Sequence, residues 1–153
     1  MKRKGAASGR EKGAAKPFWL SKAIMAMTRV EWESLCARCG RCCVLKYEDP
    51  KTLKILYTKW ACRYLDLETC RCACYRNRKT KMPECIDLYQ CSVKVRAWLP
   101  PSCAYRLVAK GHDLPSWHPL KTGDPDSAKK AGMSVLGHVI PEPGEEPVTK
   151  KRV

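Results

Sequence analysis

The segment Cys36-Ala37-Arg38-Cys39-Gly40-Arg41-Cys42-Cys43 is the most informative feature of this chain, because it places four thiols within eight residues. A helix over the segment would align Cys36, Cys39 and Cys43 on one face. A turn at Gly40 would also bring three or more sulfurs together. Converging sulfurs are the ligands that a soft metal ion prefers, so either geometry predicts a metal-binding segment.

The chain has 153 residues, and all eleven of its cysteines fall between residues 36 and 103. Hydrophobic residues make up 44%, but this fraction includes cysteine, and there is only one phenylalanine. A core formed by apolar burial alone would be thin, and thin cores are commonly held by disulfides or a metal. We therefore expect a small domain stapled by its cysteines. Outside the opening segment these are Cys62, Cys70, Cys72, Cys74, Cys85, Cys91 and Cys103.

The choice between disulfides and a metal depends on the compartment. Residues 1–16 are basic and contain no apolar run like that of a secretory signal. No later stretch approaches the roughly 20 apolar residues that cross a bilayer. An odd number of cysteines leaves one thiol unpaired, and adjacent cysteines such as Cys42 and Cys43 pair only with strain. The sequence therefore predicts a cytoplasmic, metal-binding protein with no membrane segment.

The formal net charge of +15 raises the question of nucleic-acid binding. Residues 1–16 carry +5 of this charge, and residues 150–152 add +3, so more than half of the excess lies near the two ends. The five tryptophans could stack on bases, but a chain with so few other large apolar residues needs them in its core. A nucleic-acid partner is therefore an alternative that we do not favour, and a protein partner stays open.

Proline and glycine divide the chain into three segments. We expect a disordered basic leader over 1–16, a cysteine-cluster metal-binding domain over 17–139 and a disordered tail over 140–153. Thr28-Arg29-Val30-Glu31 has the form of a capping box at a helix start. The other expected elements are helices over 19–27, from Ser102 to Gly111 and from Asp124 to Gly132, and strands over 55–58 and 134–139. This is an α+β fold that is mainly helical and loop-rich.

Zinc and iron–sulfur chemistry both fit the cysteine spacing. Zinc sites commonly use cysteine pairs separated by two residues, as in Cys36/Cys39 and Cys39/Cys42. Iron–sulfur clusters also use such a triplet with a distant fourth cysteine, but here Cys43 follows at once and no cysteine precedes a proline. We therefore expect zinc, with iron or an iron–sulfur cluster as the alternative.

The sequence contains no pattern on which a hydrolase or lyase activity can rest, and whether the protein is an enzyme stays open. None of the three histidines lies in an HExxH or HxE pattern, and there is no phosphate-binding loop, nucleophile elbow or nucleotide fingerprint. Among residues other than cysteine, His118 is the best candidate for a metal ligand. Its neighbours Trp117 and Pro119 instead favour a packed surface histidine. We assign no catalytic residue and no organic cofactor site.

Several further segments accompany the opening one. They are Glu31-Trp32-Glu33-Ser34-Leu35-Cys36, Ala61-Cys62-Arg63, Leu67-Glu68-Thr69-Cys70-Arg71-Cys72, Trp98-Leu99-Pro100-Pro101-Ser102-Cys103 and Leu114-Pro115-Ser116-Trp117-His118. Together they resemble the YcgN-like branch of the YkgJ-type cysteine-cluster proteins, which carry a CxxCxxCC signature and are regarded as zinc- or iron-chelating domains. The resemblance implies a metal-binding protein whose biochemical role is unassigned.

The resemblance also implies nine candidate metal ligands. Cys74 and Cys91 depart from the family pattern, and Cys74 is close enough in sequence to replace a neighbour. Nine thiols exceed the eight of two mononuclear sites, so a bridged site or one spectator thiol would resolve the mismatch. Two other functions stay open, a metal-stapled nucleic-acid or protein adaptor and an iron–sulfur redox or methyl-transfer component. The candidate ligands are Cys36, Cys39, Cys42, Cys43, Cys62, Cys70, Cys72, Cys85 and Cys103.

Overall fold

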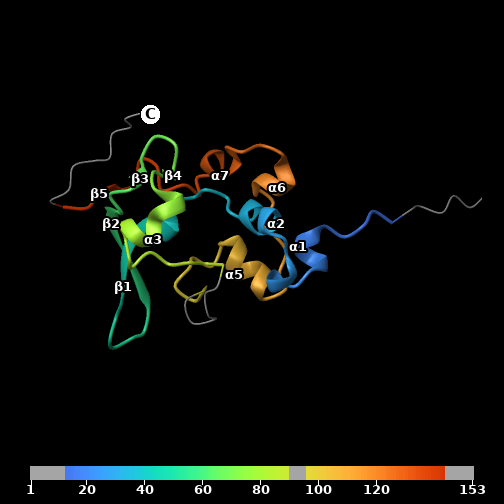
Figure 1. Cartoon of the computed structure of the whole chain (residues 1–153), viewed down its shortest axis with the longest axis horizontal. Helices are drawn as coiled ribbons and strands as arrows, with labels where there is room; N and C mark the ends of the chain where they lie inside the picture. Colours follow the sequence, from blue (N-terminus) through green and yellow to red (C-terminus); the bar gives the residue numbers. More distant parts are fainter. Residues whose placement is uncertain (1–12, 90–95, 144–153) are drawn as a thin grey trace, which may run out of the picture.

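The computed structural model describes residues 13–89 and 96–143, which form a helical half and a strand half (Figure 1). The helical half contains α1 (Phe18–Ser21), α2 (Arg29–Ser34), α5 (Ala104–Ala109) and α6 (Pro119–Thr122). The strand half contains β1 to β5 and α3 (Arg78–Lys81), and α7 (Ser127–Lys130) lies between the halves. Cys91 and most of the predicted leader and tail fall outside the described residues.

The helical half has its own hydrophobic core. The rings of Trp32 and Tyr105 pack with centroids 4.5 Å apart, and the Tyr105 hydroxyl donates a hydrogen bond to the Trp32 carbonyl at 3.0 Å. This bond fixes α2 against α5. The buried residues of the cluster are Met27, Trp32, Leu35, Leu99, Ala104, Tyr105, Val108 and Leu114.

The capping box predicted at Thr28 is confirmed. The Glu31 N–H donates to the Thr28 hydroxyl at 3.2 Å, and the Thr28 N–H donates to a Glu31 carboxylate oxygen at 2.9 Å. Two of the free N–H groups at the start of α2 are satisfied in this way.

The single helix predicted over 19–27 is wrong, because the chain breaks it into α1 and the 3-10 helix η1 (Ile24–Ala26). Lys22 and Ala23 between them have extended backbones. The break turns Phe18, Trp19 and Ile24 onto the same core cluster, so tertiary packing overrides the helical spacing.

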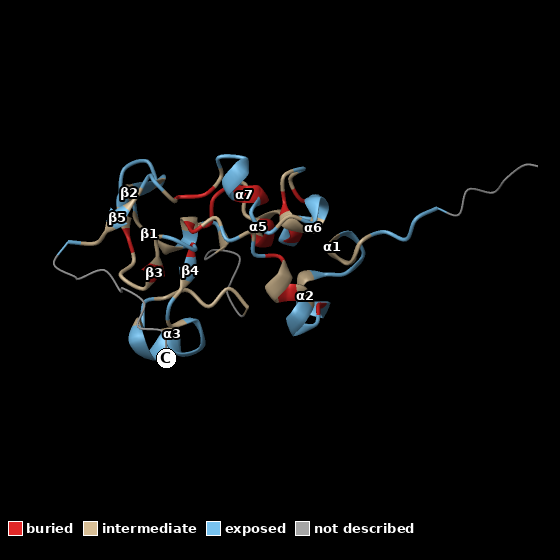
Figure 2. Cartoon of the chain, turned by 90° about the horizontal axis from the view of Figure 1, so that it is seen from above, coloured by how far each residue is buried: buried red, intermediate tan, exposed pale blue. Residues whose placement is uncertain are grey.

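The strand half is built from two small sheets. β1 (Val44–Glu48) and β2 (Ile55–Ala61) form an antiparallel hairpin, and β5 (Ile140–Pro141) pairs with β2 in parallel. β3 (Leu65–Asp66) and β4 (Arg71–Cys72) pair antiparallel, followed by η3 (Tyr75–Asn77) and α3. Buried residues occur in both halves (Figure 2). The buried cluster of the strand half consists of Val44, Ala61, Leu65, Cys70 and Val135.

The predicted strand over 55–58 is confirmed and extends to Ala61. The strand predicted over 134–139 is wrong, because this segment turns. The Val135 N–H donates to the Cys39 carbonyl at 2.9 Å, and the Leu136 N–H donates to the Ser134 hydroxyl at 3.2 Å. These bonds take the groups that a ladder would use, and the last strand is β5 instead.

Two helix starts also shift from their predicted positions. The helix expected from Ser102 begins at Ala104, with Cys103 as its N-cap residue. The helix expected after Asp124 begins at Ser127, with Asp126 in the N-cap position. In both cases the predicted helix exists and its start lies one or more residues later.

The prediction of a small domain with mixed helices and strands is confirmed, with 30% helix and 14% strand among the residues that the structure describes. Within the described residues, no helix combines the length and the apolar character needed to cross a lipid bilayer. The chain passes between the halves in the segments that join α2 to β1, α3 to α5 and α7 to β5 (Figure 1). The first carries Cys36 and Cys39, and the second carries Cys85 and Cys103.

Candidate metal centre

The cysteine segment contains a turn rather than a continuous helix. α2 ends at Ser34, and Gly40 adopts a left-handed conformation with φ of 77° before the 3-10 helix η2 (Arg41–Cys43). A Cβ at Gly40 would lie 2.5 Å from the Cys70 sulfur and 2.6 Å from Val135 Cγ2. Only glycine permits both this backbone conformation and this close approach.

Four thiols interact electrostatically near the end of α2. Burial, followed by the charges of Cys42, Cys39 and Cys103, raises the pKa of Cys36 to about 12. Burial also raises the pKa of Cys103 to about 12, with smaller contributions from the charges of Cys39 and Cys42. Water reaches Cys36 and Cys42, whose residues are exposed, but protein atoms fill most of the volume around these sulfurs. The sulfurs of Cys36, Cys39, Cys42 and Cys103 are therefore close enough for the negative charge of any one thiolate to be felt by the other three.

Backbone N–H groups point at several of these sulfurs and oppose the effect of burial. The N–H of Arg38 lowers the pKa of Cys36, and that of Arg41 lowers the pKa of Cys39. At the start of α5, the N–H groups of Arg106 and Tyr105 act on Cys103 in the same direction. Hydrogen bonds to sulfur favour the thiolate, which is the form that binds a metal.

Cys42 is the most acidic thiol of the set. A hydrogen bond from the Cys43 thiol lowers the pKa of Cys42 to about 7, and the same bond raises the pKa of Cys43. Lys46 also favours the Cys42 thiolate. Its ammonium donates to the carbonyls of Arg41, Cys42 and Val44 at 3.4, 3.1 and 3.0 Å, so it is fixed beside the cysteine turn.

A second group of thiols lies in the strand half. The sulfurs of Cys72 and Cys74 are 3.8 Å apart. Burial, followed by the charges of Cys72, Cys62 and Cys85, raises the pKa of Cys74 to about 11. Burial likewise raises the pKa of Cys62 and of Cys85, and in each case the charge of Cys72 adds to the effect. Every pair within Cys62, Cys72, Cys74 and Cys85 is thus close enough to interact.

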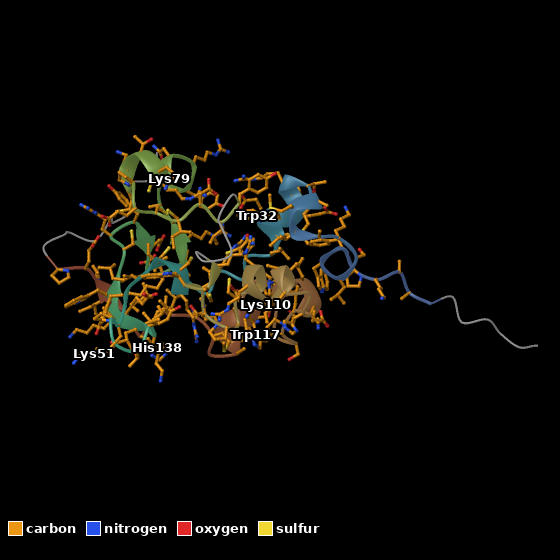
Figure 3. The ribbon with its side chains drawn as sticks, turned by 90° about the horizontal axis from the view of Figure 1, so that it is seen from below. Trp32, Lys51, Lys79, Lys110, Trp117 and His138 are labelled. Atoms are coloured by element: carbon orange, nitrogen blue, oxygen red, sulfur yellow. The ribbon has the colours of Figure 1, made fainter. Side chains whose placement is uncertain are left out.

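Basic residues stand beside this second group. Arg78 and Lys79 of α3 oppose the rise in the pKa of Cys85 that burial causes. The Lys79 ammonium donates to the carbonyls of Pro83 and Cys85 at 3.0 and 2.6 Å. Figure 3 shows Lys79 over the strand half and Trp32 in the helical half. Part of the basic excess therefore lies next to the thiols.

Cys70 differs from the other candidates because it is part of the core. It is only 7% exposed and belongs to the buried cluster of the strand half. The Ser134 hydroxyl lies 3.8 Å from its sulfur, and Cys70 itself has a left-handed backbone with φ of 56°. Its sulfur fills the space above Gly40.

His118 is not placed as a metal ligand. Its side chain is fully buried, with Nε2 2.9 Å from the Leu35 carbonyl, and its Nδ1 accepts from the Leu120 N–H at 3.1 Å. Because Nδ1 accepts, Nε2 carries the proton and donates to Leu35. The expectation of a packed histidine is confirmed, but its position on the surface is wrong. Nε2 thus holds the backbone just before Cys36, and Nδ1 caps the start of α6.

The ten cysteines of the described residues are free thiols. Within residues 13–89 and 96–143, no three His, Cys, Asp or Glu side chains meet closely enough to hold a metal ion as they stand. The donor set still suits a thiolate-bound metal, because the sulfurs interact with one another and are supplied with N–H donors and neighbouring cations. Binding of a metal would require rotation of these thiols toward one point.

A cavity of about 740 Å³ lies between the β3–β4 hairpin and α7. Cys70 and Cys72 contribute to its wall. The charged residues of the lining mix both signs, so the cavity suits a polar ligand better than a simple anion. These residues are Arg38, Arg71, Lys129, Asp66, Glu68 and Asp126.

Comparison with known proteins gives the family. The chain is 51% identical over 128 residues to a UPF0260 protein of Granulibacter bethesdensis, covering 84% of this chain and 77% of the relative. It is 50% identical over 127 residues to a UPF0260 protein of Parvibaculum lavamentivorans, covering 83% of each. The chain belongs to the UPF0260 family. No solved structure matches it.

A family model described as a CXCXC repeat matches residues 63–74 of this UPF0260 protein. The match includes Cys70, Cys72 and Cys74, whose alternating spacing was present in the sequence as a signal. Our sequence reasoning set Cys74 apart and gave no role to Lys46. The structure places Cys74 beside Cys72 and Lys46 beside Cys42. The alternating cysteines could have indicated that Cys74 lies beside Cys72, but nothing in the local sequence indicated that Lys46 lies beside Cys42.

Proposed function

We propose that this UPF0260 protein is a metal-binding protein whose cysteine thiols hold zinc, with iron or an iron–sulfur cluster as the alternative. The observation that supports the proposal is the set of backbone N–H groups directed at Cys36, Cys39, Cys62 and Cys103. Neutral buried thiols gain little from such donors, whereas metal-bound thiolates are stabilised by them. Lys46 adds positive charge near Cys42, and Arg78 adds it near Cys85.

The proposed role of the metal is structural, because each group of thiols joins segments that are far apart in the sequence. When bound, the metal supplies a centre that neutralises the thiolates and links these segments. Cys36 and Cys103 belong to different segments that meet at the core of the helical half. We place the protein in the YcgN-like branch of the YkgJ-type family and in the cytoplasm, where free thiols persist.

The proposal is tested by metal analysis of the full chain purified without oxygen. Bound zinc gives no visible absorption, whereas an iron–sulfur cluster does, so elemental analysis and a visible spectrum identify the metal. Structural zinc contributes roughly 10–16 kcal/mol in small peptides, comparable with the net stability of a whole domain. Removal of the metal under reducing conditions should therefore abolish the cooperative unfolding transition. An unchanged transition in metal-free, reduced protein would exclude the proposal.

A second candidate function is that of an adaptor for a nucleic acid or a protein. The β1–β2 hairpin exposes Tyr47 (55%), Leu53 (69%) and Tyr57 (42%). Exposed Lys51 and Lys54 lie at the same hairpin, and aromatic rings among basic residues are typical of surfaces that stack on bases. We rank this function second because Glu48 and Asp49 interrupt the basic surface.

A further inference from the structure

We propose that Cys72 and Cys74 form a thiol–disulfide exchange pair, and that the neighbouring cavity binds its substrate, a small disulfide that carries both amino and carboxylate groups. The sulfurs of Cys72 and Cys74 are 3.8 Å apart. Cys72 contributes to the wall of the cavity of about 740 Å³, whereas Cys74 is not among the described residues that line it. The proposal goes beyond metal binding, because it assigns a reaction to one pair of thiols and a ligand class to the cavity.

The backbone brings the two sulfurs together at the end of a strand. Residues i and i+2 of a regular strand point to one face, but the rise of about 3.3 Å per residue holds them about 6.6 Å apart. The chain leaves the strand conformation after Cys72, where β4 ends, and Cys74 is already the N-cap residue of η3. The Ala73 N–H donates to the Tyr64 carbonyl at 2.8 Å and so fixes this bend. A disulfide requires the sulfurs to approach to about 2.0 Å, which rotation of the two side chains can supply.

The cavity determines the order in which the two thiols react. A disulfide bound in the cavity meets Cys72 first, because only this sulfur of the pair lies at the wall. The Cys72 thiolate attacks one sulfur of the substrate, so that a mixed disulfide forms and the other half of the substrate leaves as a thiolate. Cys74, 3.8 Å behind Cys72, is close enough to carry out the second attack.

The second attack completes a two-electron exchange. The Cys74 thiolate attacks the Cys72 sulfur, the Cys72–Cys74 disulfide forms, and the remaining half of the substrate leaves as a thiolate. The protons lost by Cys72 and Cys74 balance those taken up by the two released thiolates. The protein dithiol is thus oxidised to a disulfide, and the substrate disulfide is reduced to two thiols without any further reactant.

The lining of the cavity fits a substrate with charges of both signs. Exposed Arg38, Arg71 and Lys129 come from the cysteine turn, β4 and α7, and they can bind carboxylates on the substrate. Exposed Asp126, beside α7, can bind an ammonium group. The volume lies within the range of roughly 300–1,000 Å³ that is typical of sites for small organic molecules. A peroxide or an uncharged disulfide would leave these charged groups unused.

The test incubates the full-length, reduced chain with oxidised glutathione, a disulfide that carries amino and carboxylate groups. The wild type should release two equivalents of reduced glutathione, and its tryptic peptide 72–76 should become two hydrogen atoms lighter. Cys74→Ser should stop at the mixed disulfide, with one glutathionyl group on Cys72. Cys72→Ser should abolish the exchange, whereas the matched control Cys85→Ser, another half-buried thiol that does not line the cavity, should retain it.

A second measurement separates recognition in the cavity from the reactivity of the thiol. In the Cys74→Ser background, Arg38→Gln combined with Lys129→Gln should slow adduct formation with oxidised glutathione by about tenfold. The same change should not slow the reaction with uncharged 2-hydroxyethyl disulfide. The control pair Lys51→Gln and Lys54→Gln, on the β1–β2 hairpin away from the cavity lining, should slow neither reaction.

Several results would overturn the proposal. They are an unreactive wild type, modification of other cysteines in preference to Cys72, no trapped adduct in Cys74→Ser, or equal slowing of the charged and uncharged disulfides. If Cys72→Ser does not fold, the wild type and Cys74→Ser still decide whether the exchange occurs. The readout is a covalent change in peptide 72–76, so it is distinct from the metal analysis that tests the proposed function.

Discussion

Replacement of Gly40 by alanine tests whether the cysteine turn is held by close packing. Gly40 has φ of 77°, and an added Cβ would meet the Cys70 sulfur at 2.5 Å and Val135 Cγ2 at 2.6 Å. A residue with a Cβ loses about 1–2 kcal/mol in the left-handed conformation. Insertion of a methyl group into packed surroundings adds about 1–3 kcal/mol. Gly40→Ala should therefore destabilise the metal-loaded protein by about 2–5 kcal/mol.

Gly111→Ala is the matched control. Gly111 has a nearly identical φ of 75°, but nothing lies within 4 Å of its added Cβ. It should lose only the conformational part, about 1–2 kcal/mol. Denaturant unfolding of both variants with the metal bound gives the two free energies of unfolding from the midpoints and slopes.

A double-mutant cycle identifies the source of the difference. Val135→Ala removes one of the two groups that the new Cβ would meet, so Gly40→Ala should cost less in that background. Equal losses for Gly40→Ala and Gly111→Ala, with no coupling to Val135→Ala, would refute the close-packing argument. The turn would then depend on glycine for its backbone conformation alone.

Three other predictions concern a buried hydrogen bond, a buried histidine and the basic surface. Tyr105→Phe leaves the buried Trp32 carbonyl without its hydrogen bond of 3.0 Å and should lower the free energy of unfolding by about 1 kcal/mol, measured by denaturant titration against the exposed control Tyr47→Phe. Burial lowers the pKa of His118 from 6.5, so the unfolded state binds more protons below that pH, and stability should fall as the pH drops through 6.5. His118→Gln should flatten that part of the stability curve at constant metal load, whereas an equally steep curve would exclude His118 as its source. If the basic residues only solvate the surface, protein lacking residues 1–16 should not bind mixed-sequence RNA or duplex DNA at low salt, and submicromolar, salt-sensitive binding would instead favour the adaptor.

Local sequence signals determined the elements whose bonds are themselves local. The capping box at Thr28 needs only groups three residues apart, and it forms as predicted. Gly40 indicated a turn as the alternative to a continuous helix, because no other residue tolerates a left-handed backbone so readily, and the turn is present. The clustering of cysteines and the small mixed domain were also evident from composition and spacing.

Only the tertiary structure decided which thiols share a neighbourhood. Cys36 and Cys103 meet because two distant segments bury apolar residues in one core, and no spacing rule encodes that meeting. The break in the helix predicted over 19–27 has the same cause. Long-range packing also explains why no strand forms over 134–139. The Val135 N–H donates its hydrogen bond to the carbonyl of Cys39, which is far away in the sequence. Spacing along the chain fixes bonds within a few residues, whereas long-range burial selects the partners of everything else.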